Sequence, residues 1–100
     1  MIKLVALYRT PPDPAPFDTH FNEIHLPLLR QLPGILSLDI LRVTGAPIGE
    51  STYHVLVEAG FESRKAMDAA LASREGKAVA RALMMFAADL VTIFHGEPLS

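Results

Sequence analysis

The chain has 100 residues, enough for one domain (residues 1–100) with a modest core, and half of them are apolar. Its formal charge of -2 gives no electrostatic case for nucleic acid or an anionic membrane, and the absence of cysteine excludes disulfides and thiolate chemistry. The N-terminal apolar run is too short for a signal peptide or a membrane span, so a cytoplasmic protein is expected. This apolar fraction is high for a small monomer, and it predicts that a second copy covers part of the surface.

The first strand and the loop after it are marked by composition. Residues 2–8 form a short apolar run that predicts a β-strand, and its weak alternation is typical of a strand covered on both faces. The segment TPPDPAP follows, and proline has no amide donor, so this segment predicts a loop outside the sheet. A helix is expected to begin near Asp13 or Pro14.

Residues 14–32 predict one amphipathic helix that carries two histidines and an internal proline. At about 100° per residue, His25 lies about 50° from the centre of the apolar stripe and His20 about 90° from it, which predicts that His25 is buried. In a regular helix the two imidazoles are about 140° apart and cannot share a metal ion. Pro27 cannot donate to the carbonyl of Glu23, so a kink or a break is expected there. The stripe consists of Phe17, Phe21, Ile24 and Leu28.

The rest of the chain predicts three more strands and two more helices. Each of the two helices is expected to start at a serine N-cap, Ser63 or Ser73. The order β-α-β-β-α-β with short connections predicts a ferredoxin-like α+β sandwich, in which helices cover one face of a four-stranded antiparallel sheet. The expected strands are residues 35–44, 52–61 and 90–98, and the expected helices are residues 63–73 and 73–89.

The sheet face away from the helices is expected to meet a second copy. Alternation along residues 35–44 places Asp39 on the face opposite Leu38 and Ile40, beside Leu41 and Val43. In the next strand it places His54 on one face with Leu56 and Glu58. Five apolar residues assigned to the uncovered face are too many for contact with water, so a homodimer with sheet facing sheet is predicted. These residues are Leu4, Leu36, Leu38, Ile40 and Ile93.

Two blocks of sequence resemble a known family. The first is YRTPPDPAPFDTHFNEIHLPLLRQLPGI, with Tyr8, the Pro-Pro-Asp run, Phe17, His-Leu-Pro-Leu and Leu-Pro-Gly as the matching features. The second is REGKAVARALMMFAADLVTIFHGEP, a weaker match. Together they resemble the EthD-like proteins of the dimeric α+β barrel superfamily, named for an ether-degradation operon product. The resemblance implies a ferredoxin-like protomer and a barrel dimer, and the family often carries the label oxidoreductase.

Seven residues are candidates for a site. The family's helix histidine aligns with His25, and a neutral imidazole can move a proton near pH 7, so His25 is the expected acid–base residue, assisted by Asp39 or Tyr8. The alternatives are that His25 is a core residue that stiffens the helix at Pro27, that Asp39 is a solvent-facing carboxylate, and that Tyr8 is a core aromatic ring. Residues expected to contact a hydrophobic ligand, or else simply to pack in the core or line a barrel mouth, are Phe21, His54, Met84 and Phe86.

The expected function follows from the resemblance and these candidates. It is acid–base or cofactor-free oxidative chemistry on a small hydrophobic carbonyl, lactone or aromatic compound, as in a lactone isomerase, a cyclase or a cofactor-free oxidoreductase. The alternative is a non-catalytic ligand-binding or accessory dimer of a degradation pathway. The sequence has no glycine-rich phosphate loop, dinucleotide fingerprint or strong metal motif, which argues against a nicotinamide or nucleotide cofactor. No cofactor and no metal are expected, and an oxidoreductase would need a cofactor-free or a haem route.

Overall fold

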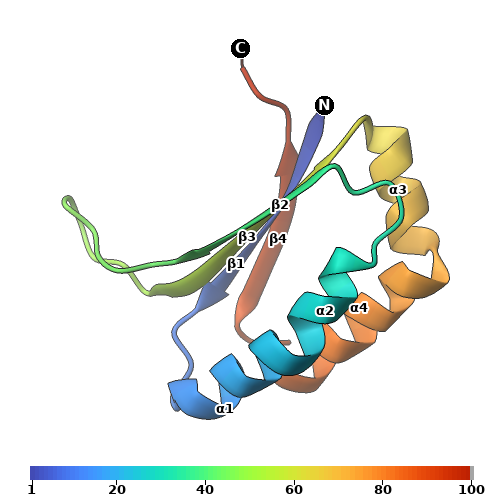
Figure 1. The fold of residues 1–100 in the computed structure, drawn as a ribbon. Helices are drawn as coiled ribbons and strands as arrows, with labels where there is room; N and C mark the ends of the chain where they lie inside the picture. The colour runs from blue at the N-terminus through green and yellow to red at the C-terminus, as the bar shows by residue number, and fades with distance from the viewer. Residues whose placement is uncertain (100) are drawn as a thin grey trace.

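The computed structural model describes residues 1–99, which form a four-stranded antiparallel sheet with helices on one face (Figure 1). The strand order is β2-β3-β1-β4, so β1 and β3 lie in the middle and β4 is an edge. This confirms the predicted ferredoxin-like α+β fold. The elements are β1 (Ile2–Arg9), α1 (Pro14–His20), the π-helical turn η1 (Phe21–His25), α2 (Leu26–Arg30), β2 (Ser37–Arg42), β3 (Tyr53–Phe61), α3 (Arg64–Ala72), α4 (Arg74–Phe86) and β4 (Val91–Gly96).

The first helical segment is continuous, but it widens where the distortion was predicted. The amide of Leu26 donates to the carbonyl of Phe21, five residues back, which defines the π turn η1. Pro27 follows in the first turn of α2, where a missing amide is tolerated. The prediction of a distortion near Pro27 is confirmed, and its form is a wide turn and not a break.

The wide turn changes the position of the two histidines relative to each other. The 140° separation applies to a regular helix, whereas a π turn brings residues five apart toward the same side. The rings of His20 and His25 accordingly both pack against Phe86, with centroid distances of 4.4 and 5.3 Å. The expected burial of His25 is confirmed, since its exposed fraction is 1%.

The side of the sheet that faces the helices is apolar and holds the core. Even-numbered residues of β1 and odd-numbered residues of β3 point to this side and are paired in register, as Tyr8 is with Val55. Four of the five residues assigned to the uncovered face point here instead: Leu4, Leu38, Ile40 and Ile93. Leu36 precedes β2 and is exposed.

The uncovered face is apolar as predicted, but through different residues. Register pairs put five apolar side chains there: Val5, Leu7, Leu41, Leu56 and Phe94. Beside them Lys3 forms an ion pair with Glu58 at 2.9 Å. The earlier assignment was wrong because strands with apolar residues on both faces give no alternation from which to choose the face.

The helices are fixed locally by the predicted caps. The Ser63 hydroxyl accepts from the amide of Ala66, and the Ser73 hydroxyl accepts from that of Gly76. Asp13 caps α1 in the same way through the amide of Ala15. Among residues 1–99, no helix combines the length and the apolar character that crossing a membrane requires.

Gly76 should be essential for packing α4 against α3. A Cβ atom at this position would meet the backbone carbonyl oxygens of Ala70 and Leu71, which cannot swing aside. We expect Gly76→Ala to lower the free energy of unfolding by about 1–3 kcal/mol, measured by urea denaturation. Gly45→Ala is the control, because nothing lies within 4 Å of a Cβ there. Equal midpoints for the two variants would contradict the close approach.

Candidate functional site

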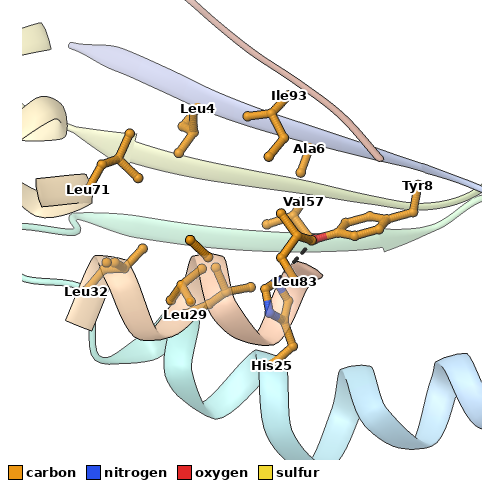
Figure 2. A pocket seen from close by; sticks show the side chains of 13 residues that line it. Leu4, Ala6, Tyr8, His25, Leu29, Leu32, Val57, Leu71, Leu83 and Ile93 are labelled. Carbon is orange, nitrogen blue, oxygen red and sulfur yellow. Dashed lines mark hydrogen bonds between the residues drawn. The ribbon is translucent and has the colours of Figure 1, made fainter. Parts of the chain in front are cut away.

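A cavity of about 160 Å³ lies between the sheet and the helices (Figure 2). Of the described residues that line it, only Tyr8 and His25 have polar side chains. The other walls are aliphatic and come from every layer of the fold, so the cavity exists only in the assembled domain. Representative residues are Leu4 and Ala6 of β1, Val57 of β3, Leu29 of α2, Leu83 of α4 and Ile93 of β4.

The cavity has a deep polar end and an apolar rim. Tyr8 and His25 are each 1% exposed, so the polar end is closed to solvent. Leu71 and Ile93 are 39% and 48% exposed, and both line the cavity. Ala80 of α4 is exposed and lines the cavity as well, so the cavity opens among the end of α3, α4 and the edge strand β4. A ligand that entered there would pass apolar side chains before it reached a polar atom.

Tyr8 and His25 form a hydrogen-bonded pair. The Tyr8 hydroxyl lies 3.2 Å from Nε2 of His25, and Figure 2 shows the imidazole rising from the helix toward it. Tyr8 is held near the end of β1 by Phe17 and Phe21, which contact its ring edge-on at 5.6 and 5.7 Å. His25 closes the π turn, so the local distortion at Pro27 aims it at the sheet.

Both members of the pair are neutral near pH 7. Burial and, to a lesser extent, the nearby charge of His20 together lower the pKa of His25 to about 4. Burial also raises the pKa of the Tyr8 hydroxyl above its ordinary value. An uncharged imidazole and an uncharged phenol can exchange donor and acceptor roles, depending on which ring nitrogen carries the hydrogen.

The second ring nitrogen of His25 is free to meet a ligand. Nδ1 is buried and has no hydrogen-bond partner among residues 1–99. A buried polar atom left unpaired costs about 1–3 kcal/mol, so a molecule that hydrogen-bonds to Nδ1 would remove this cost. Nδ1 donates when Tyr8 donates to Nε2, and it accepts when Nε2 donates to Tyr8.

The structure brings only some of the candidate residues to this pair. Asp39 is exposed and lies in register with Glu58 on the uncovered sheet face, away from His25. Of the two residues expected to assist His25, Tyr8 is the one that contacts it. Phe21 packs against both rings of the pair. Met84 is 59% exposed and lines a hollow outside the cavity. Phe86 contacts His25 but does not line the cavity either.

His54 lies elsewhere than alternation predicted. Tyr8 pairs with Val55 and Arg9 pairs with Tyr53, so His54 is the extra residue of a β-bulge. The bulge turns its ring away from the Leu56 side and toward α1, where Nε2 lies 2.8 Å from a carboxylate oxygen of Asp18. The expectation that His54 shares a face with Leu56 and Glu58 is wrong for this reason.

The aliphatic walls are the part of the site that sequence reasoning did not identify. Leu29 and Leu32 lie four and seven residues after His25 and are buried with it, whereas Ile24 of the predicted stripe is 49% exposed. Their spacing from His25 was the available signal. Leu83 and Ile93 gave no signal beyond hydrophobicity. In residues 1–99, no three His, Asp or Glu side chains lie close enough to hold a metal ion together.

Comparison with known proteins identifies close relatives. The chain is 36% identical to an ethyl tert-butyl ether D (EthD) family protein from Bacillus halodurans, with a TM-score of 0.94 and 99% of each chain covered. It is 30% identical to an uncharacterised 11.0 kDa protein from the thcB–thcC intergenic region of Rhodococcus erythropolis, over 97% of this chain and 94% of the relative. A dimeric ferredoxin-like protein from Jannaschia shares the fold at 14% identity, with a TM-score of 0.74 and coverage of 98% and 100%. No family model matches the sequence.

The depressed pKa of His25 should appear in the pH dependence of stability. Because its pKa falls from 6.5 to about 4 on folding, the unfolded chain binds more protons between these values. The contribution of neutral His25 is complete above pH 6.5 and is lost as the pH falls to about 4, a loss of about 3 kcal/mol. His25→Gln cannot titrate there, so its free energy of unfolding should fall about 3 kcal/mol less between pH 7 and pH 4 than that of the wild type. Urea titrations at both pH values measure the difference, and parallel pH profiles would contradict the burial effect.

Proposed function

The chain belongs to the EthD family, and from that premise we propose that it binds a small, neutral, hydrophobic carbonyl, lactone or aromatic compound in the cavity between sheet and helices. We propose further that His25 and Tyr8 move a proton on this compound. The observation that carries the proposal is the hydrogen bond between these two residues at the closed end of an otherwise apolar cavity.

The cavity volume limits the size of the ligand. A dry apolar cavity of about 150 Å³ accommodates benzene. At about 160 Å³, this cavity suits one six-membered ring or a lactone of similar size. Aliphatic walls favour such a ligand through apolar burial, at roughly 25 cal/mol per Å².

The charge of the site limits the ligand to neutral compounds. No Lys or Arg is among the described residues that line the cavity, and Tyr8 and His25 are uncharged near pH 7. Burying a carboxylate without a partner costs several kcal/mol. A carbonyl or hydroxyl group, in contrast, is satisfied by one hydrogen bond from or to Nδ1 of His25.

The pair supplies the parts needed for proton transfer. When Nε2 of His25 donates to the Tyr8 oxygen, Nδ1 is a base that faces the ligand. The Tyr8 hydroxyl is then free to donate to the oxygen on which negative charge develops. Burial disfavours the imidazolium that forms, because the charged ring is desolvated. The negative charge of the adjacent enolate or phenolate offsets this desolvation cost.

The low pKa of His25 favours a second candidate, non-catalytic binding. A general base works best when its pKa lies near the operating pH, and a pKa of about 4 makes His25 a weak base before a ligand binds. In that case the pair only orients a neutral ligand, and the protein acts as a binding or accessory component of a degradation pathway.

Exchange of deuterium into cyclohexanone separates the two candidates. We expect phenol and cyclohexanone, but not benzoate, to bind the wild type in calorimetry, and we expect the wild type in D₂O to exchange the hydrogens beside the carbonyl. His25→Gln should keep binding and lose exchange, because Gln donates and accepts but does not titrate. Tyr8→Phe should slow exchange about 10–100-fold.

The control for this assay is His95→Gln, since His95 is exposed on β4 and should leave exchange unchanged. Binding without exchange in the wild type would support the non-catalytic candidate. Failure of both neutral probes to bind would overturn the proposed function.

A homodimer through the uncovered sheet faces is the second part of the proposal. The five apolar side chains of that face lie together on adjacent strands, with Lys3 and Glu58 beside them. Patches of this kind in small proteins mark association sites. The Jannaschia protein of the same fold is described as dimeric.

Sedimentation tests this interface. At micromolar concentration the wild type should sediment as a dimer and Leu56→Asp as a monomer, because the added carboxylate would be buried against the partner's apolar face. Ile24→Asp is the control, since Ile24 is 49% exposed on the helical side. A monomeric wild type would refute the dimer, and a dimeric Leu56→Asp would refute the interface.

A further inference from the structure

A second polar pair joins α1 to the sheet. Nε2 of His54 on β3 lies 2.8 Å from a carboxylate oxygen of Asp18 on α1, and since a carboxylate accepts, the imidazole donates. The two side chains are 15% and 30% exposed, so their surroundings partly shield this hydrogen bond from water and strengthen it. Among residues 1–99, it is the only hydrogen bond that links α1 to a strand.

Phe17, the residue before Asp18, connects this pair to the site. Its buried ring contacts the His54 ring edge-on at 5.3 Å and the Tyr8 ring edge-on at 5.6 Å. Tyr8 in turn bonds to Nε2 of His25 at 3.2 Å. A continuous series of side-chain contacts therefore leads from Asp18 to His25, although neither Asp18 nor His54 lines the cavity.

The β-bulge places His54 in this series. In a regular strand His54 would alternate with its neighbours and point to the uncovered face, away from α1. Bulges redirect side chains and are common beside active sites. This bulge lies next to the register pair of Tyr8 and Val55, so β3 departs from regular pairing beside the residue that contacts His25.

We propose that Asp18 and His54 are positioning residues for the Tyr8–His25 pair: their hydrogen bond holds α1 on the bulge of β3, and α1 holds the Phe17 ring against Tyr8. At 3.2 Å, the bond between Tyr8 and His25 is at the long end of the usual range, so a small displacement of the Tyr8 ring would weaken it. The effect on proton transfer rests on the proposed function, whereas the bond itself is measurable without a ligand.

Nitrogen NMR of the unliganded protein at pH 7 tests this role. The shifts of Nδ1 and Nε2 of His25 report which nitrogen carries the hydrogen, and we expect one fixed tautomer in the wild type. His54→Phe keeps a ring beside Phe17 but removes the donor, and Asp18→Ala removes the acceptor. In both variants the two shifts should move toward the averaged values of an imidazole that exchanges between tautomers. His54→Gln keeps a donor and should restore shifts close to those of the wild type.

Ser63→Ala is the control for a general loss of stability, because it removes the N-cap of α3 and none of these contacts. Its His25 shifts should match those of the wild type. Unchanged shifts in His54→Phe and Asp18→Ala would overturn the proposal, as would an equal change in Ser63→Ala or a failure of His54→Gln to restore the shifts. If His54→Phe does not fold, Asp18→Ala decides alone, since the Asp18 side chain is partly exposed.

A second readout connects the positioning role with the proposed reaction. Asp18→Ala should slow deuterium exchange into cyclohexanone about tenfold and leave its dissociation constant unchanged, because the cavity walls stay in place and only the alignment of the pair changes. An unchanged exchange rate, or equal losses of binding and exchange, would overturn the positioning role. If the wild type itself does not exchange cyclohexanone, the proposed proton transfer fails, while the shifts of His25 still decide whether Asp18 and His54 position the pair.

Discussion

The amide hydrogen that Pro27 lacks is the constraint on which the site depends. A regular helix would need that hydrogen for the carbonyl of Glu23, and the chain instead closes a wider turn through Leu26 and Phe21. The wide turn ends at His25 and sets its ring beneath the Tyr8 hydroxyl. Because Pro27 occupies the first turn of the next helix, its missing amide is tolerated there, and the helix continues as α2.

Burying a neutral polar pair at the end of an apolar cavity has two linked consequences. Desolvation lowers the pKa of His25 and raises that of Tyr8, so the pair keeps its protons and its hydrogen bond over a wide pH range. The same low polarity excludes charged ligands and strengthens any hydrogen bond that a neutral ligand forms with Nδ1. In the proposed function, the physical features that weaken His25 as a base in the empty protein are therefore those that would select its ligand.

Much of the fold was predictable from the sequence, and the errors have local physical causes. Strand and helix periodicities, the serine caps and the order of elements were sufficient for the architecture, and the helical wheel correctly placed His25 inside. Two single-residue irregularities changed side-chain directions: the bulge at His54 and the π turn before Pro27. The bulge has no composition signal, and Pro27 signals a distortion but not its form, because each form is decided by which hydrogen bonds the neighbouring strand or the proline leaves available. Strands apolar on both faces concealed which side held Leu4 and Ile93.

The two faces of the sheet are coupled through neighbouring residues of the same strands. On β1 and β4, Leu4 and Ile93 line the cavity, whereas Val5 and Phe94, next to them in sequence, are paired with each other on the uncovered face. Strand β4 is an edge, held on one side only by β1, and Ile93 on it forms part of the rim. A second copy packed over Val5 and Phe94 would restrain that edge from the far side. Since Ile93 of this edge strand forms one side of the rim, such restraint would hold that side of the opening in place.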